Sequence, residues 1–393
     1  MKKFFLVFYI IFVFIFAFSS TFDLFLQKGD ILNFKNLKYD DLNKIPSAYY
    51  KNDEFFFRAG GSKNFYTFNL GEDIWNITIK PTKDSTILFY DENTSEQNIY
   101  NQKIFIEELK KAKKYIYMSI YDIDNIEIVQ TLKDLSRDGI YIKIVLESQN
   151  QNTYSSMLEK EDNIELKYDS NYALMHNKFI IVDGYCLITG STNLTNNGLN
   201  YNSNNMIFIY NNDLIENYIL EFEEQFYDEL FGKKNDGKKL NNKFDFNSGY
   251  IESYFTPEDN LKQRIIDLIN SSEKNIYVMI FTFTDKEIAD ALIKAKNRGV
   301  EVKVIMENFQ AGSKWSTWEQ LKSENVEVIV DKNSKVFHHK VIIFDEKKVL
   351  TGSFNFTNSA QNKNDENSII IHSSEISEEY IKEFKRYWNI YNL

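Results

Sequence analysis

Apolar and polar positions alternate in two neighbouring stretches near the N-terminus, residues 66–70 and 75–79. A short connection at 71–73 separates them, and the apolar positions are Tyr66, Phe68, Leu70, Trp75, Ile77 and Ile79. Because side chains two residues apart lie on the same face of a strand, this pattern predicts a β-hairpin with one buried face. We expect residues 20–85 to form a small β-rich accessory segment, in which we recognise no chemistry.

A longer pattern occurs twice in the rest of the chain. An apolar run at 115–121 precedes a helical stretch that ends at Gly139, and a second apolar run follows at 140–147; the same order recurs at 275–281, Gly299 and 300–307. Each copy is typical of a strand–helix–strand unit with parallel strands. The sequence therefore predicts an α/β protein built from two similar halves.

A polar, charged stretch rich in turn-forming residues lies between the two copies, at residues 233–249. Such composition is typical of a connector. We therefore assign residues 86–232 to the first half and residues 250–393 to the second half.

The extreme N-terminus differs from the remainder. Lys2 and Lys3 precede an apolar run at residues 4–18, and Ser19 follows it. This order is typical of a secretory signal or an uncleaved N-terminal anchor. We therefore expect residues 1–19 to direct export, so that the protein is periplasmic, secreted or anchored by this segment.

The overall charge narrows the possible partners. The chain has 393 residues and a formal net charge of −11, which argues mildly against a protein that wraps nucleic-acid phosphates.

The chain has a single cysteine, Cys186. This count excludes an intramolecular disulfide and a cysteine-based metal site.

Two nine-residue segments carry the chemistry, one in each half. His176, Lys178 and Asp183 recur as His338, Lys340 and Asp345, 162 positions later, and each set is followed by a glycine, a serine, a variable residue and an asparagine. The downstream polar residues are Ser191, Asn193, Ser353 and Asn355. In a strand, a histidine and a lysine two residues apart share a face, so two such halves packed about a pseudo-twofold axis bring both pairs together.

This duplicated motif, HxKxxxxD followed by GSxN, resembles the catalytic motif of the phospholipase D superfamily at all its fixed positions. The resemblance implies two pseudo-symmetric repeats, each a mixed, mainly parallel sheet flanked by helices. It also implies phosphodiester cleavage through a phosphohistidine, with His176 as the nucleophile and His338 as the general acid and base. No metal or cofactor is required by that chemistry.

The remaining motif residues receive roles from the same resemblance. Lys178 and Lys340, aided by Asn193 and Asn355 and by Ser191 and Ser353, are expected to bind the phosphoryl oxygens. Asp183 and Asp345 face away from the histidines if the strand is regular, so a structural role is favoured over proton transfer. Glu366 fits the place of an acidic residue that orients a histidine in relatives; its counterpart is Asn204, which leaves one orienting interaction unassigned. His339 and His372 are expected to be incidental.

The substrate stays open at this point. A phospholipase D that hydrolyses phospholipid to phosphatidic acid and a head-group alcohol at a membrane surface is favoured by the expected export and the acidity. The alternatives are a secreted, metal-independent endonuclease that acts on nucleic acid, a phosphatidyltransferase of the cardiolipin synthase type, and an inactive binding module. No obligatory protein partner is inferred, because both motifs lie in one chain.

Overall fold

The computed structural model describes residues 85–232, 241–246 and 249–392, together with the backbone of strands between residues 21 and 80. The chain divides into two units, Met1–Lys83 and Asp84–Leu393. The predicted export segment, residues 1–19, lies outside the described residues.

The N-terminal unit contains two small sheets among its described strands, with strand orders β1-β6-β5 and β2-β4-β3. The bounds are β1 Thr21–Gln27, β2 Ile31–Phe34, β3 Ala48–Lys51, β4 Glu54–Arg58, β5 Phe65–Leu70 and β6 Asp73–Lys80. β5 and β6 are antiparallel, and Phe68 lies opposite Trp75. This register confirms the predicted hairpin.

In the first half, the described residues form a seven-stranded sheet in the order β10-β9-β8-β11-β12-β13-β7. The strands are β7 Ser85–Tyr90, β8 Tyr115–Ile120, β9 Tyr141–Leu146, β10 Ile164–Tyr168, β11 Lys178–Val182, β12 Cys186–Gly190 and β13 Asn204–Ile209. The helices are α2 Ser95–Leu109, α3 Ile126–Arg137, α4 Thr153–Leu158, α5 Asn196–Asn200 and α6 Asn212–Phe226.

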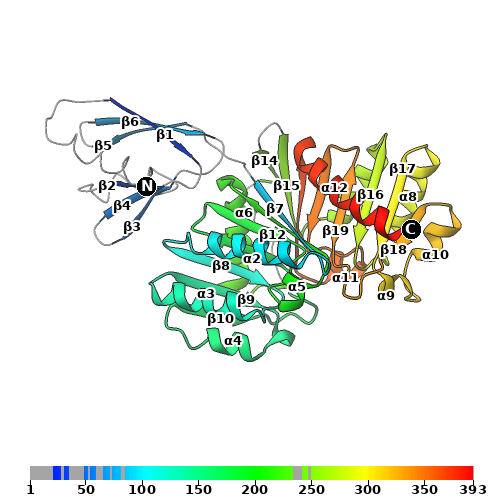
Figure 1. Ribbon diagram of the computed structural model, residues 1–393, viewed down its shortest axis with the longest axis horizontal. Coiled ribbons are helices and arrows are strands. Elements are labelled where there is room, and N and C mark those ends of the chain that lie inside the picture. The colour runs from blue at the N-terminus through cyan, green and yellow to red at the C-terminus, as the bar shows by residue number, and fades with distance from the viewer. Residues whose placement is uncertain are drawn as a thin grey trace. The chain divides into compact units, whose positions relative to one another are not determined.

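The second half repeats this plan and adds one edge strand, in the order β14-β15-β21-β20-β19-β16-β17-β18 among the described residues. The strands are β14 Lys243–Phe246, β15 Gly249–Thr256, β16 Asn275–Ile280, β17 Glu301–Met306, β18 Glu327–Val330, β19 Lys340–Phe344, β20 Lys348–Gly352 and β21 Glu366–His372. The helices are α7 Leu261–Ser271, α8 Lys286–Asn297, α9 Asn308–Ala311, α10 Trp318–Ser323, α11 Asn358–Asn362 and α12 Ser374–Tyr391. Figure 1 shows the first half in cyan to green and most of the second half in yellow to red.

Both sheets are mixed, as expected, and both contain the predicted strand–helix–strand units. β8, β9 and β10 pair in parallel, as do β16, β17 and β18. The other ladders of the two sheets are antiparallel among the described residues. The expectation of mainly parallel sheets therefore holds for the repeat units alone, because the strands that carry the motif form β-meanders.

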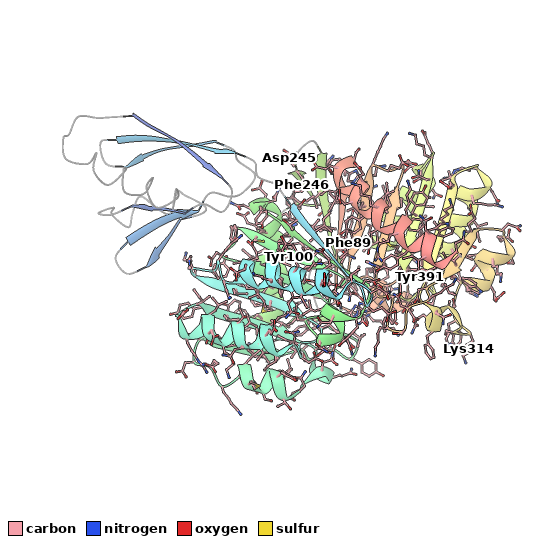
Figure 2. All side chains as sticks on the ribbon, in the orientation of Figure 1. Phe89, Tyr100, Asp245, Phe246, Lys314 and Tyr391 are labelled. Atoms are coloured by element: carbon pink, nitrogen blue, oxygen red, sulfur yellow. The ribbon has the colours of Figure 1, made fainter. Side chains whose placement is uncertain are left out.

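The predicted connector 233–249 is in part a strand. β14, which carries the Asp245 and Phe246 labelled in Figure 2, pairs antiparallel with β15. Phe244 and Phe246 are buried in the core, because alternate positions of this polar segment are aromatic. The connector residues 233–240 and 247–248 lie outside the described residues.

A large apolar core lies between the two sheets and includes one face of α6 and of α12. The apolar side chains of α12 recur at helical spacing, at Ile376, Tyr380, Phe384, Tyr387 and Tyr391. Each sheet also has a core of its own on its outer face, beneath the remaining helices. Within the described residues, no helix is both long and apolar enough to cross a bilayer.

Candidate active site

The two motif segments lie at equivalent places, because Lys178 is the first residue of β11 and Lys340 is the first residue of β19. The four basic side chains are buried, with exposed fractions of 6% for His176, 4% for Lys178, 7% for His338 and 0% for Lys340. Buried basic groups need compensating partners, and these partners define the site.

Each half of the molecule holds the histidine of the other half in place. The backbone N–H of His176 donates to the carbonyl of Asp365 at 2.8 Å, and the N–H of His338 donates to the carbonyl of Ser203 at 2.8 Å. Both contacts belong to short parallel bridges just before the motif strands. The exchange of backbone bonds places both histidines at the boundary between the halves, as the sequence predicted.

Glu366 orients His176 rather than the histidine of its own half. The Nδ1 atom of His176 lies 2.7 Å from Oε2 of Glu366, and Asn364 donates to the other carboxylate oxygen at 3.0 Å. With Nδ1 protonated and bound, Nε2 carries the lone pair of the neutral ring. The imidazole of His176 is therefore held in the tautomer that a nucleophile requires.

Asn204 takes the corresponding place beside His338. Its Oδ1 atom lies 2.9 Å from Nδ1 of His338, and its Nδ2 donates to the carbonyl of Gly198 at 3.0 Å, which fixes the orientation of the amide. The carbonyl of Ser191 lies 3.1 Å from the same Nδ1 atom. Asn204 is thus the second orienting residue, and it supplies a hydrogen bond without a charge.

The two motif serines support these orienting residues. Ser353 donates to Glu366 at 2.6 Å, and Ser191 donates to Asn204 at 3.1 Å. Each serine oxygen also accepts a backbone N–H from the neighbouring strand, and both side chains are fully buried. These contacts give Ser191 and Ser353 a positioning role, and their expected contact with phosphate stays a prediction.

The glycines before these serines allow the close approach. Gly190 and Gly352 have φ values of 141° and 147°, and a Cβ atom at either place would meet a backbone oxygen of the adjacent strand at 2.3 Å. A side chain does not fit there. The glycine–serine pair thus brings each serine hydroxyl onto the orienting residue.

Each lysine is held by its own motif and by one aromatic ring. Nζ of Lys178 donates to the carbonyl of His176 at 2.9 Å and lies 4.9 Å from the ring centre of Tyr121. Nζ of Lys340 donates to the carbonyl of His338 at 2.8 Å and lies 5.0 Å from the ring of Phe281. An ammonium group has three N–H donors, so this geometry retains donors for the oxygens of a bound anion.

The electrostatics of the site favour an anionic ligand. Burial, followed by the charges of Lys178 and Lys340, holds the pKa of His176 well below its usual value, and the pKa of His338 is lowered in the same way. Burial lowers the pKa of Lys178 to about 7 and also lowers that of Lys340, while burial raises the pKa of Glu366 to about 7. A phosphodiester anion between the lysines would offset the burial of the cationic groups.

The motif aspartates lie at the other end of the same strands. Asp183 accepts the backbone N–H groups of residues 113–115 at 2.7–2.8 Å, and Asp345 does the same for residues 273–275 at 2.7–3.3 Å. Both have positive φ values, 49° and 52°. These contacts give Asp183 and Asp345 a structural role at the start of β8 and β16, and a catalytic part for either residue stays a prediction.

The two motif asparagines differ in their contacts. Oδ1 of Asn355 accepts the backbone N–H of Thr282 at 3.3 Å, whereas Oδ1 of Asn193 is buried without a hydrogen-bond partner among the described residues. Neither side chain makes a described contact with the histidines or lysines. Their expected part in phosphate binding stays a prediction.

The other two histidines differ in their surroundings. His339 is fully buried, with Nδ1 3.2 Å from Nδ2 of Asn205, and it packs among aromatic rings. His372 lies 2.6 Å from Glu252 and stacks on Tyr250, away from the motif.

A scan against protein-family models matched the family described as "Cardiolipin synthase, PLD-like domain" at residues 105–226 and 265–388. The two matches coincide with the two halves and cover more than half of the chain. The chain belongs to the phospholipase D superfamily.

Relatives within the superfamily match part of the chain. A phospholipase D from Rickettsia bellii is 38% identical over 132 residues, which are 34% of this chain and 66% of that protein. A mitochondrial cardiolipin hydrolase from Xenopus tropicalis is 34% identical over 134 residues, 34% of this chain and 64% of that protein. The matches thus span somewhat less than two thirds of these relatives.

The fold of the superfamily is also found in a solved structure that covers most of this chain. The phosphatidylserine synthase of Haemophilus influenzae has a TM-score of 0.58 at 13% identity, over 76% of this chain and 85% of that chain. This likeness confirms the α/β architecture with two halves.

Sequence reasoning named Asn204 without assigning it a role and missed two further residues of the site, Tyr121 and Phe281. These two aromatic residues directly follow the equivalent strands β8 and β16, at the same place in each copy. The alignment of the two repeats places these residues at equivalent positions. It does not predict that each orienting residue serves the histidine of the other half, because that contact depends on how the halves pack.

Proposed function

We propose that this chain is a phosphodiesterase that hydrolyses phospholipids to phosphatidic acid and a head-group alcohol through a phosphohistidine at His176. One observation carries the proposal: two buried histidines are each held at Nδ1 by a residue of the opposite half, and the charges of two buried lysines act on both rings. This set supplies a nucleophile, a proton donor and positive charge for the phosphoryl oxygens.

In the first step, Nε2 of His176 attacks phosphorus and a P–N bond forms. The bond from phosphorus to the head-group oxygen breaks, and the leaving oxygen takes a proton from Nε2 of His338, whose protonated form is favoured by the negative charge of the bound phosphodiester. Glu366 stabilises the positive charge that His176 acquires, because its carboxylate lies 2.7 Å from Nδ1. Lys178 and Lys340 hold the non-bridging oxygens.

In the second step, neutral His338 accepts a proton from water, and the water oxygen attacks phosphorus. The P–N bond breaks, its electron pair returns to Nε2 of His176, and phosphatidic acid leaves. The assignment of His176 as nucleophile is supported by its charged partner, since a carboxylate favours the cationic phosphohistidine and the neutral amide of Asn204 does not.

Lipid is favoured over nucleic acid as substrate by three observations. Relatives carry the names phospholipase D and mitochondrial cardiolipin hydrolase. The chain has a net charge of −11, which disfavours binding to a polyanion. The apolar run at residues 4–18 supports export or anchoring at a membrane, where the lipid substrate lies.

The test is a parallel assay of the purified protein, with a chelator present, on vesicles of phosphatidylcholine, phosphatidylethanolamine and phosphatidylglycerol and on single- and double-stranded DNA. Release of head group with phosphatidic acid supports the proposal. Cleavage of DNA without lipid turnover overturns it in favour of a nuclease, and no turnover of either class would indicate a binding module.

The acceptor is measured in the same assay by adding glycerol. Phosphatidyl transfer to glycerol in place of hydrolysis would assign the chain to phosphatidyltransferases of the cardiolipin synthase type. An acid quench with phosphorus-labelled lipid is expected to trap label on the wild-type chain and none on His176→Ala.

A further inference from the structure

The two halves differ in the segment that follows the second strand of each repeat. In the first half, a short polar turn, Ser148–Asn150, leads from β9 to Asn152, the cap of α4. In the second half, a longer segment leads from β17 to Thr317, the cap of α10. We call this segment, residues 308–316, the aromatic loop.

The aromatic loop exposes large apolar side chains. Phe309 is 83% exposed and Trp315 is 69% exposed, and Nζ of Lys314 lies 4.8 Å from the ring of Trp315. Figure 2 shows Lys314 at the outer margin of the second half, near α9. The connection at the same place in the first half, residues 147–152, contains no aromatic residue.

The aromatic loop lies at the same edge of the sheet as the candidate active site. Gln310 contacts the hydroxyl of Thr282 at 3.4 Å, and the neighbouring Phe281 ring lies 5.0 Å from the ring of His338. A short chain of contacts thus connects the aromatic loop with His338.

Both ends of the loop are fixed to the body. The N–H of Asn308 donates to Asp331 at 2.7 Å, and the N–H of Thr317 donates to the carbonyl of Phe283 at 3.1 Å. Phe309 and Trp315 are thus exposed on a segment that is anchored at both ends. Exposed apolar surface is unfavourable in water, so burying these side chains would lower the free energy.

We propose that the aromatic loop inserts Phe309 and Trp315 into the surface of a lipid bilayer and so docks the active site on its substrate. Tryptophan and phenylalanine with an adjacent lysine suit the boundary between acyl chains and anionic head groups. Two aromatic side chains bury roughly 300–500 Å², well below the roughly 800 Å² per partner of a stable protein interface. The proposal rests on the lipid substrate proposed above.

The local test is a fluorescent probe at the loop. Cys186 is the only cysteine and is fully buried, so Phe309→Cys in the full chain is labelled selectively with an environment-sensitive dye. Tyr141→Cys is the matched control, because Tyr141 is 61% exposed and begins β9, at the end of that strand remote from the site. The probes are phosphatidylcholine vesicles with and without phosphatidylglycerol, and a single-stranded DNA oligonucleotide.

A blue shift of the dye at position 309 with vesicles, and none at position 141, supports insertion of the loop. No shift at 309 in the presence of vesicles overturns it. A shift at 309 with DNA and none with vesicles overturns it in favour of base stacking on the same side chains.

A second variant separates docking from chemistry. The double change Phe309→Ser and Trp315→Ser is expected to lower turnover of vesicle lipid by roughly 10- to 100-fold, the loss that follows from removing one or two inserted aromatic side chains. Turnover of a small water-soluble phosphodiester is expected to stay unchanged, as is that of Tyr141→Ser on both substrates.

Failure of the two proposals is distinguishable. If the chain does not hydrolyse lipid but the dye still shifts on vesicles, the loop binds membranes and the assigned reaction is wrong. If the chain hydrolyses vesicle lipid and the double variant does so equally well, the reaction stands and the docking role is wrong.

Discussion

The two halves of this chain share one strand plan and differ in the groups that touch the histidines. His176 is paired with the carboxylate of Glu366, whereas His338 is paired with the amide of Asn204, although both partners occupy the same place on β21 and β13. A symmetric scaffold thus holds an asymmetric pair of imidazoles. The comparison teaches that the two rings differ in the charge of the partner that each one binds.

A second difference lies in the helices of the central core. On α12, Arg386 and Tyr387 donate to Asp91 at 3.4 and 2.7 Å. On α6, the equivalent place holds acidic residues, and burial raises the pKa of Glu221 well above its usual value and that of nearby Glu258 to about 8. The buried carboxylate of Asp91 is thus paired with a cation, whereas burial favours the neutral form of the carboxyl groups of Glu221 and Glu258.

The largest expected effect comes from removing each histidine. His176→Ala is expected to lose at least about 1,000-fold in kcat and to form no phosphoenzyme, because the nucleophile is gone. His338→Ala is expected to lose turnover of lipid to a similar extent but to form phosphoenzyme from a nitrophenyl phosphodiester, whose leaving group needs no proton. A rapid acid quench measures the phosphoenzyme.

The reverse result, with phosphoenzyme in His176→Ala and none in His338→Ala, would exchange the two roles. Thermal unfolding of both variants serves as the control, since neither substitution is expected to prevent folding.

The next effect tests the partner of each ring directly. Glu366→Gln keeps a hydrogen-bond acceptor and removes the charge, so kcat is expected to fall by about 10- to 100-fold, as for other residues that orient a functional imidazole. Asn204→Asp adds a charge beside His338, which raises its pKa and moves the alkaline limb of the pH–rate profile to higher pH. The profiles are measured on a water-soluble phosphodiester.

Equal losses in Glu366→Gln and Asn204→Ala, with no shift of either limb, would mean that the asymmetry has no chemical consequence.

The motif aspartates should affect stability more than catalysis. Each carboxylate accepts several backbone N–H groups, so Asp183→Asn and Asp345→Asn are expected to lower the free energy of unfolding by about 1–3 kcal/mol each. Asparagine tolerates the positive φ at both positions. Denaturant unfolding measures the loss, and a large fall in kcat of the folded variants would return these residues to the active site.

The last prediction concerns the pH dependence of stability at the variable position of the motif. The second half has His339 there, and the first half has Asn177. Burial lowers the pKa of His339 to about 3 from 6.5. The unfolded chain therefore binds a proton that the folded chain does not, and stability falls by up to about 1.4 kcal/mol per pH unit as the pH drops from about 6.5 towards 3.

His339→Asn is expected to flatten this part of the stability profile, because the unfolded variant no longer binds a proton at position 339. The other histidines keep their own contributions. The free energy of unfolding, measured from pH 7 to pH 4.5 for both proteins, tests this. Parallel profiles would contradict the assigned pKa shift.

Much of the fold follows from local patterns. The strand–helix–strand units, the N-terminal hairpin and the two motif strands each carry a clear periodicity, and the offset between His176 and His338 places them at equivalent positions. The antiparallel meanders and strand β14 were not predicted, because a short apolar run does not determine which strand it pairs with.

The site was foreseen as a set of residues but not as a network. Motif spacing identifies His176 and Lys178, and strand alternation turns Asp183 away from them. The spacing does not show that Ser353 and Glu366 serve the opposite half, because that contact spans 190 residues of sequence between His176 and Glu366. Such contacts depend on how the two sheets dock.

The exchange of orienting residues also has a consequence for biosynthesis. A ribosome that has completed β11 has already produced His176 and Lys178, but the carboxylate that orients this histidine arrives 190 residues later, on the last strand of the second sheet. A nascent or truncated chain therefore holds His176 without its counter-charge. Glu366 and His338 both join this residue only after the second half has been made and has docked.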